Sequence, residues 1–243
     1  MHSLANALGF LTLLPMRRKS IVEEEVARAV RFFPAVGVAL GLVIASVGEI
    51  ACTHLPPAIV AVGLVALLAI LTGGLHLDGV ADLFDAIGAG AGDRQARLAI
   101  MRDSRIGAHG AASVTILLLA KTSALTQVLD HGDVTALIVF PAVARWAVVP
   151  LILFFPSARE DGLGAAFKRH AKLTDLALAS VFASVIVIAS KRVLLTGFAA
   201  LSGAAAVGLL AQARLGGFTG DVCGAVIEIS EVICLFALVA GPL

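Results

Sequence analysis

The sequence predicts an all-α fold, a polytopic integral membrane helix bundle with about seven transmembrane helices. Of its 243 residues, 59% are hydrophobic and only 14% are charged, and the mean hydropathy is +1.00. Soluble domains carry about 25% charged residues. Seven segments also approach the roughly 20 apolar residues that are needed to cross a bilayer. They lie near residues 32–52, 56–75, 109–129, 134–155, 174–190, 193–213 and 223–240.

The N-terminal segment does not have the pattern of a secretory signal peptide. Met1 to Leu14 contains no Lys or Arg, and the basic run Arg17-Arg18-Lys19 follows the apolar part instead of preceding it. Because Pro15 stops the apolar pattern after about 14 residues, we expect a short interfacial or re-entrant helix here.

Turn-like sequences separate the predicted spans. Examples are Leu55-Pro56-Pro57, Asp130-His131-Gly132-Asp133 and Pro156-Ser157. None of the intervening segments is long enough to fold alone, so residues 1–243 are predicted to form a single membrane domain. The three cysteines lie in apolar segments without C-x-x-C spacing, which favours small buried side chains over metal ligands.

The basic residues predict the orientation. With a cytoplasmic N-terminus, fourteen of the 18 Lys and Arg residues fall on the cytoplasmic face. Only Lys191 and Arg192 fall on the opposite face, while Lys121 and Arg145 lie within spans. We therefore expect a multi-pass protein of the cell (inner) membrane without a nucleic-acid partner. The loops predicted to be cytoplasmic cover residues 76–106, 156–173 and 216–221.

An acidic stripe stands out in the first of these loops. Asp78, Asp82 and Asp85 follow an i, i+4, i+7 spacing, which places all three carboxylates on one face of a helix. Like charges at this spacing destabilise a helix unless they are neutralised. A Mg²⁺ ion would do so and would keep coordination positions for substrate phosphate. The alternative is a solvated acidic face.

Two further motifs contain residues that suit the binding of a metal ion or a phosphate. Asp103 could supply another metal ligand, and the adjacent Arg102 and Arg105 suit diphosphate oxygens, although a juxtamembrane basic cluster would look the same. In the glycine-rich turn at 216–221, Thr219 or Asp221 can cap the following helix, whose free N–H groups would face an anion. This turn alone is a weak signal.

Several charges fall inside predicted spans, where they are costly and generally face a bundle interior. Lys121 and Arg145 lie in the third and fourth spans, and Glu228 and Glu231 lie in the seventh. Two interpretations are open. These residues line a polar pocket for a large substrate, or they pair with one another as buried ions.

Runs spread over nearly the whole chain resemble the adenosylcobinamide-GDP ribazoletransferase family, also called cobalamin-5′-phosphate synthases. One departure is Leu13, where the N-terminal motif of the family has Arg. The runs that carry the resemblance include Phe10-Leu11-Thr12, Gly73-Gly74-Leu75-His76-Leu77-Asp78-Gly79, Met101-Arg102-Asp103-Ser104-Arg105, Ala120-Lys121, Glu160 with Gly162-Leu163-Gly164, and Gly216-Gly217 with Thr219-Gly220-Asp221, Glu228 and Glu231.

The resemblance implies an Mg²⁺-dependent transfer of adenosylcobinamide phosphate from adenosylcobinamide-GDP to α-ribazole or its 5′-phosphate. GMP leaves, and adenosylcobalamin or its 5′-phosphate forms. It also implies Asp82 and Asp78 as catalytic residues. The implied metal ligands are Asp78, Asp82, Asp85 and Asp103. The implied substrate-binding residues are Arg102, Arg105, Lys121, Arg145, Thr219, Asp221 and Glu228. The expected partners are the two substrates and the lipid bilayer, with the oligomeric state open, a homo-oligomer included.

Two other classes compete. A CDP-alcohol phosphotransferase also places an acidic D-G-x-x-A-type motif at a helix end, but its signature continues with Arg and ends G-x-x-x-D-x-x-x-D. Here Ala81 is followed by Asp82, and no such tail follows Asp85. A secondary transporter could use the intramembrane charges as an ion path, but it would leave the acidic stripe unexplained.

Overall fold

The computed structural model describes residues 2–14, 23–90, 92–187 and 193–240, and within these residues helices joined by short turns and loops make up the regular secondary structure. An isolated bridge joins Ser157 to Phe218. The helices in chain order are α1 (His2–Leu11), α2 (Glu23–Ala27), the 3₁₀ helix η1 (Arg28–Phe32), α3 (Phe33–Cys52), α4 (Pro57–Thr72), α5 (Leu75–Gly88), α6 (Arg94–Ile100), α7 (Ala108–Asp130), α8 (Val134–Phe154), α9 (Gly162–His170), α10 (Leu173–Val187), α11 (Val193–Leu215) and α12 (Gly220–Val239).

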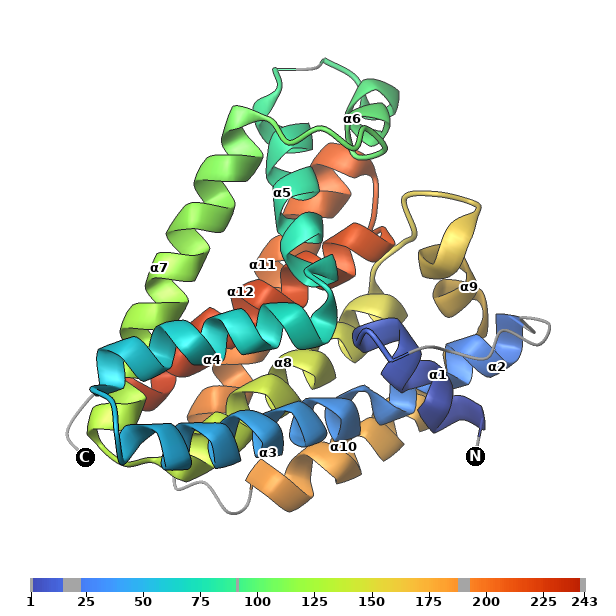
Figure 1. Ribbon diagram of the computed structural model, residues 1–243. Coiled ribbons are helices and arrows are strands. Elements are labelled where there is room, and N and C mark those ends of the chain that lie inside the picture. The colour runs from blue at the N-terminus through green and yellow to red at the C-terminus, as the bar shows by residue number, and fades with distance from the viewer. Residues whose placement is uncertain (1, 15–22, 91, 188–192, 241–243) are drawn as a thin grey trace.

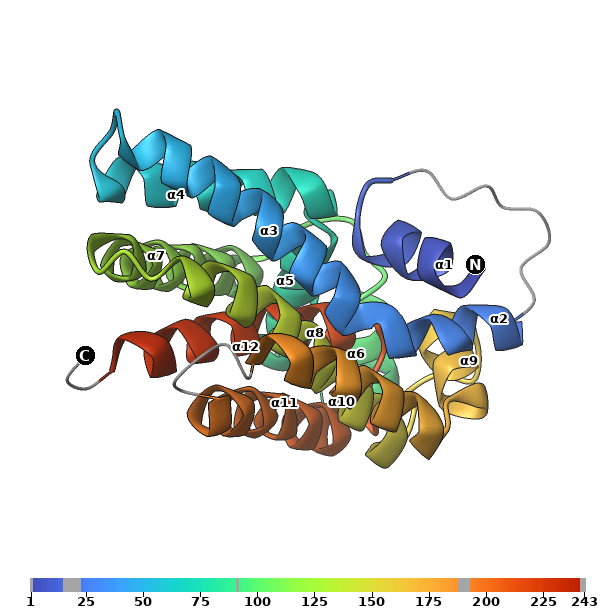
Figure 2. The same ribbon diagram turned by 90° about the horizontal axis from the view of Figure 1, so that it is seen from below.

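The helices α8 and α12 form the centre of the bundle. In their most apolar stretches 72% of the residues are buried, compared with 28% for α7. In Figure 2, α3 and α4 lie on one side of this central pair and α10 and α11 lie on the other. The centre is apolar except for a group of charged side chains, described below.

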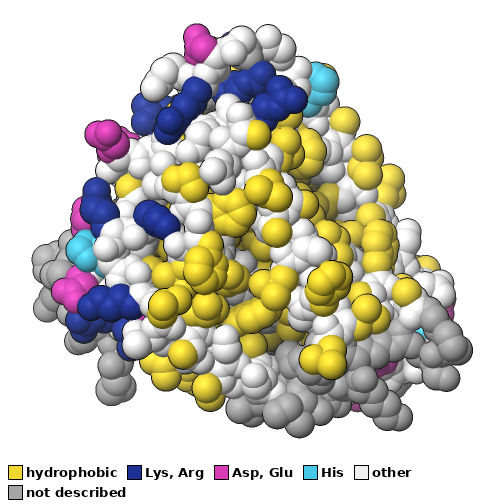
Figure 3. Space-filling model, turned by 180° about the vertical axis from the view of Figure 1, so that it is seen from behind, with side chains coloured by type: hydrophobic (Ala, Val, Ile, Leu, Met, Phe, Trp, Pro, Cys, Tyr) yellow, Lys and Arg dark blue, Asp and Glu magenta, His cyan; other side chains and the backbone are white. Residues whose placement is uncertain are grey.

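Five helical segments are long and apolar enough to cross a membrane. They confirm the predicted spans near 32–52, 109–129, 134–155, 193–213 and 223–240. Figure 3 agrees: hydrophobic side chains cover the middle of the visible surface, while charged side chains gather along two edges, over α6 and over α2 and α9. The protein is therefore a multi-pass membrane protein with a helical bundle fold.

The second predicted span, residues 56–75, differs from expectation. The helix α4 ends at Thr72, and α5 starts at Leu75 after a bend of 90°. Gly73 and Gly74 cause the break, because both have left-handed backbone angles (φ of 66° and 68°), which end a helix and which other residues rarely adopt. After the bend, α5 runs across the polar end of the bundle toward α6 (Figure 1).

Two other predicted elements are shorter or more buried than expected. The helix α10 has 15 residues, fewer than a full span, and the end of the predicted segment 174–190 lies outside the described residues. The predicted N-terminal helix is present as α1, although Pro15 and the basic run after it lie outside the described residues. Phe10 stacks on Phe33 of α3 and meets Phe167 of α9 edge to face, so α1 is packed against the protein.

Candidate functional site

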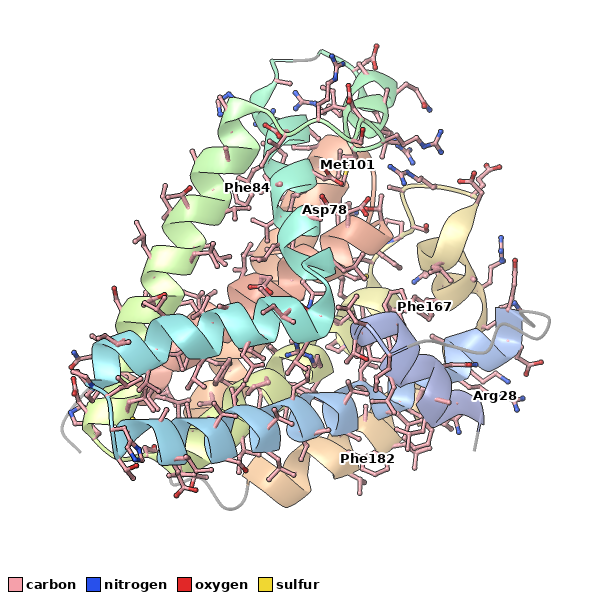
Figure 4. The ribbon with its side chains drawn as sticks, viewed as in Figure 1. Arg28, Asp78, Phe84, Met101, Phe167 and Phe182 are labelled. Carbon is pink, nitrogen blue, oxygen red and sulfur yellow. The ribbon has the colours of Figure 1, made fainter. Side chains whose placement is uncertain are left out.

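The acidic helix α5 crosses the bundle against the start of α12. Asp78 lies in the half of α5 where this crossing occurs (Figure 4). The contact is close because Gly79 has no side chain: the space that its Cβ would occupy is filled by the backbone carbonyl of Asp221. The acidic stripe of α5 is thereby brought to the N-terminal turn of α12.

The N-terminus of α12 is capped as the sequence predicted. The Thr219 hydroxyl accepts a hydrogen bond from the Val222 amide (3.3 Å) and lies 3.1 Å from the Asp221 carboxylate, to which it donates. Thr219 itself is buried, whereas the Asp221 side chain is about one-third exposed. The cap thus fixes Asp221 at the surface of the crossing.

Three neighbouring carboxylates, from α5 and α12, influence Asp82 at this crossing. The pKa of Asp82 is raised to about 7. Burial is the largest cause, and the negative charges of Asp78, Asp221 and Asp85 add to it. Asp82 is partly buried on α5, a helix that lies beyond the bend and outside the five long spans. The name acidic cluster is used below for Asp78, Asp82 and Asp221.

The acidic cluster is not a ready-made metal cage. Among the described residues, no three Asp, Glu, His or Cys side chains are close enough to hold an ion between them. Mg²⁺ does not require such a cage, because it commonly binds through one or two carboxylates and completes its shell with water and substrate phosphate. The all-oxygen donor set and the mutual repulsion at Asp82 fit an ion of this kind.

Asp85, a predicted metal ligand, is engaged elsewhere. Its two carboxylate oxygens accept hydrogen bonds from the amides of Gly107 (2.6 Å) and Gly110 (2.8 Å), at the start of α7. A carboxylate at a helix N-terminus satisfies free N–H groups and interacts favourably with the helix dipole. The structure therefore gives Asp85 the task of fixing α7 against α5, and we leave it out of the metal site proposed below.

Asp103, the other predicted ligand, is paired with its neighbour. Arg105 forms a two-pronged contact with it, with Nε to Oδ1 at 3.0 Å and Nη2 to Oδ2 at 2.6 Å. These hydrogen bonds lower the pKa of Asp103 to about 2. Both residues are thus engaged with each other in the loop after α6, whereas Arg102 is exposed and lies 3.8 Å from Asp161. The predicted roles of Asp103 and Arg105 stay predictions.

Arg159 is a functional candidate that the sequence analysis missed. Its guanidinium lies 3.9 Å from the Asp221 carboxylate, and it is the positive charge that offsets repulsion at Asp82. It stands in the loop between α8 and α9, more than 70 residues from Asp82 and more than 60 from Asp221. A weak sequence signal existed, since Arg159 directly precedes the Glu160 and Gly162 that belong to the resemblance.

The intramembrane charges pair with one another, which was one of the two interpretations open from the sequence. Lys121 of α7 forms ion pairs with Glu228 and with Glu231 (2.6 Å) of α12. Arg145 of α8 pairs with the other oxygen of Glu231 (2.5 Å). All four side chains are buried. Two cations and two anions balance, so this network joins α7, α8 and α12, and substrate binding by Lys121, Arg145 and Glu228 stays a prediction.

His76 lies close to this network and is almost fully buried, in the first turn of α5. Neither ring nitrogen has a hydrogen-bond partner within the described part of the chain. An unpaired buried polar group costs about 1–3 kcal/mol.

Comparison with known proteins extends over the whole chain. The family model described as cobalamin-5-phosphate synthase matches residues 3–239. A protein of Geotalea daltonii named adenosylcobinamide-GDP ribazoletransferase is 40% identical over 242 residues, which cover 96% of this chain and 95% of that protein. Proteins of the same name from Pseudomonas aeruginosa and Brevibacillus brevis are 37% and 33% identical, covering at least 98% of each chain. No solved structure matches. The chain therefore belongs to the cobalamin-5-phosphate synthase family.

Proposed function

We propose that this chain is an adenosylcobinamide-GDP ribazoletransferase, acting in the assembly of the cobalamin nucleotide loop. The observation that carries the proposal is similarity along the full length to relatives of that name at 33–40% identity. A hydroxyl of α-ribazole, or of its 5′-phosphate, attacks the phosphorus that is linked to the corrinoid. The bond from that phosphorus to the bridging oxygen of the diphosphate breaks, and GMP leaves with the bridging oxygen.

The acidic cluster is the proposed reaction centre. Asp78 and Asp82 of α5 would hold Mg²⁺, with Asp221 of α12 beside them. When bound, the ion would polarise the phosphate oxygens and neutralise charge that develops on the leaving group. A carboxylate of the cluster would accept the proton of the attacking hydroxyl.

Basic side chains of the protein would bind the phosphates of the substrate. Arg159, at 3.9 Å from Asp221, is placed where it can contact a phosphate that also faces the cluster. A guanidinium forks onto two phosphate oxygens and keeps its charge at all relevant pH values. The charge-balanced network of Lys121, Arg145, Glu228 and Glu231 is proposed to hold the three helices around this centre.

The proposed orientation places the acidic cluster on the cytoplasmic side of the inner membrane. It rests on the excess of Lys and Arg at that end of the bundle, which includes α6 and the loop after α8. Nucleotide substrates would reach the cluster from the cytoplasm. A cysteine accessibility assay on Arg28→Cys at this end, against His131→Cys at the other, tests the orientation in intact cells.

The activity test uses protein purified in detergent or reconstituted in nanodiscs. With adenosylcobinamide-GDP and α-ribazole, the wild type should form a complete cobalamin and an equal amount of GMP. EDTA should stop turnover, and Mg²⁺ should restore it. Asp82→Asn should abolish turnover, whereas Asp130→Asn, an exposed carboxylate at the far end of α7, should leave it unchanged. A wild type that is inactive with both α-ribazole and its 5′-phosphate would overturn the proposal.

The two competing classes give different results in the same preparation. A CDP-alcohol phosphotransferase would release CMP from a CDP-activated lipid, and a transporter would move an ion in proteoliposomes without releasing a nucleotide. GMP release that depends on both adenosylcobinamide-GDP and α-ribazole excludes each of them as the main activity.

A further inference from the structure

A polar cleft of about 510 Å³ lies beside the acidic cluster. One wall is formed by α6, with Arg94 and Gln95, and by the turn after it, with Arg102. The other wall is the loop after α8, which contributes Arg159, Glu160 and Asp161. The two walls are more than 50 residues apart in the sequence. The roles assigned above involve Arg159 and Arg102 but leave Glu160 and the α6 wall of the cleft without a function.

The cleft is rich in guanidinium groups that are available to a ligand. Arg94 is anchored by one Nη, which donates to the Ala158 carbonyl (2.6 Å), and the residue is otherwise exposed. Arg102 makes a long contact to Asp161 (3.8 Å), and 62% of its side chain is exposed. Arg97 of the same helix shows the contrasting case. It is buried and donates to the carbonyls of Ala86 and Ile87 at the end of α5.

Arg159 connects the cleft to the acidic cluster. One Nη lies 3.9 Å from the Asp221 carboxylate, and the other donates a long hydrogen bond (3.4 Å) to the Leu98 carbonyl. Its Nε is buried and has no hydrogen-bond partner among the described residues. One guanidinium is thus shared between the cleft and the cluster, and part of its hydrogen-bonding capacity is unused. A diphosphate that spans the cleft and the acidic cluster would contact the Arg159 guanidinium near the middle of the diphosphate.

Glu160 gives the cleft the chemistry to recognise a guanine base. It is exposed, and within the described residues its carboxylate makes no ion pair or hydrogen bond, whereas the neighbouring Asp161 faces Arg102. Guanine presents two donors side by side, N1–H and N2–H₂, which a carboxylate can accept together. Adenine presents an acceptor at N1, so a carboxylate in the same place would meet a lone pair.

We infer that this cleft binds the guanosine diphosphate part of the substrate, with Arg159 and Arg102 on the phosphates and Glu160 on the base. The inference rests on the proposed function, which supplies a guanosine diphosphate as part of the substrate. It adds the location of that part and the residue that selects guanine. The leaving GMP is then held away from the corrinoid, on the side of α6.

Nucleotide binding tests the inference without turnover. Fluorescent mant-GDP is bound to the purified protein in the presence of Mg²⁺, and GMP and AMP are compared as competitors. Wild type should prefer GMP. Arg102→Gln and Arg159→Gln should each weaken the binding of both nucleotides by about tenfold, because each variant loses a charge-assisted hydrogen bond to phosphate. Glu160→Gln should weaken GMP by about tenfold and leave AMP unchanged. Arg28→Gln, an exposed arginine outside the cleft, should behave as wild type.

The outcomes separate this inference from the proposed function. Suppose that wild type turns over adenosylcobinamide-GDP but the three cleft variants keep wild-type mant-GDP binding and the preference for GMP. The assignment of the cleft to guanosine diphosphate is then wrong, and the proposed activity stands. If wild type binds GMP through these residues but forms no cobalamin, the cleft stands and the proposed activity is wrong. Arg102→Gln and Glu160→Gln alter exposed side chains, so circular dichroism and gel filtration should show that both variants fold.

Discussion

The backbone carbonyl of Asp221 lies in the space that a Cβ atom on Gly79 would fill. This contact sets the distance between α5 and the start of α12. It therefore decides whether Asp78 and Asp82, on one helix, act together with Asp221, on the other. The acidic cluster depends on a backbone contact as much as on its carboxylates.

Gly79→Ala should separate the two helices. The added methyl group meets backbone, which cannot move aside as a flexible side chain could, so we expect a loss of about 1–3 kcal/mol in stability and a large loss of kcat. The matched control is Gly63→Ala on α4, where nothing lies within 4 Å of the added Cβ. Alanine is the better helix former, so the control should be as stable as wild type or more stable. Thermal unfolding in detergent and GMP release measure both effects. Wild-type activity in Gly79→Ala would remove the crossing from the site.

Asp82→Asn should stabilise the metal-free protein while abolishing turnover. Because burial and neighbouring carboxylates raise the pKa of Asp82 to about 7 in the fold, its ionised form opposes folding at pH 8. This cost fades as the pH falls through 7 toward about 4, the pKa of an unfolded Asp. We expect the Tm of the variant to exceed that of wild type by a few degrees at pH 8, and the difference to vanish near pH 4. Added Mg²⁺ should raise the Tm of wild type only. If the variant is less stable than wild type at pH 8 without metal, ionised Asp82 does not destabilise the fold and the expectation is wrong.

Asp85 should behave as a structural residue in spite of its place on the acidic stripe. Asp85→Ala removes the acceptor for the Gly107 and Gly110 amides and should cost about 1–2 kcal/mol, as for the loss of a helix cap. Asp85→Asn keeps an acceptor and should recover part of this loss. The diagnostic measurement is the Mg²⁺ concentration for half-maximal activity. It should be the same in Asp85→Asn as in wild type, and a rise of about tenfold or more would return Asp85 to the metal site.

The stability of the protein should depend on the charge balance of the buried network of Lys121, Arg145, Glu228 and Glu231. Lys121→Met leaves Glu228 and Glu231 with Arg145 as their remaining cation in the network and should cost about 3–5 kcal/mol. In the double variant Lys121→Met with Glu228→Leu, one cation and one anion remain, and much of the stability should return. Unfolding in SDS measures this series. Equal stability of the single and double variants would show that the pairing is not what stabilises these helices.

The sequence by itself determined the membrane class and five of the spans, because hydropathy and helical spacing are properties of neighbouring residues. It also determined the acidic face of α5 and the cap at Thr219, since both follow from spacing within one turn or two. The family followed from motifs read along the chain and was confirmed by the full-length matches.

The tertiary structure decided what those residues face. Asp78 and Asp82 share a helix with Asp85, yet packing sends Asp85 to the start of α7 and brings Asp221 to the other two. Arg159 joins them across more than 60 residues, and Lys121 is matched with Glu228 and Glu231 across more than 100. Contacts of this kind depend on which helices become neighbours, and helix packing in a membrane is selected by shape and pairing that a hydropathy pattern does not encode.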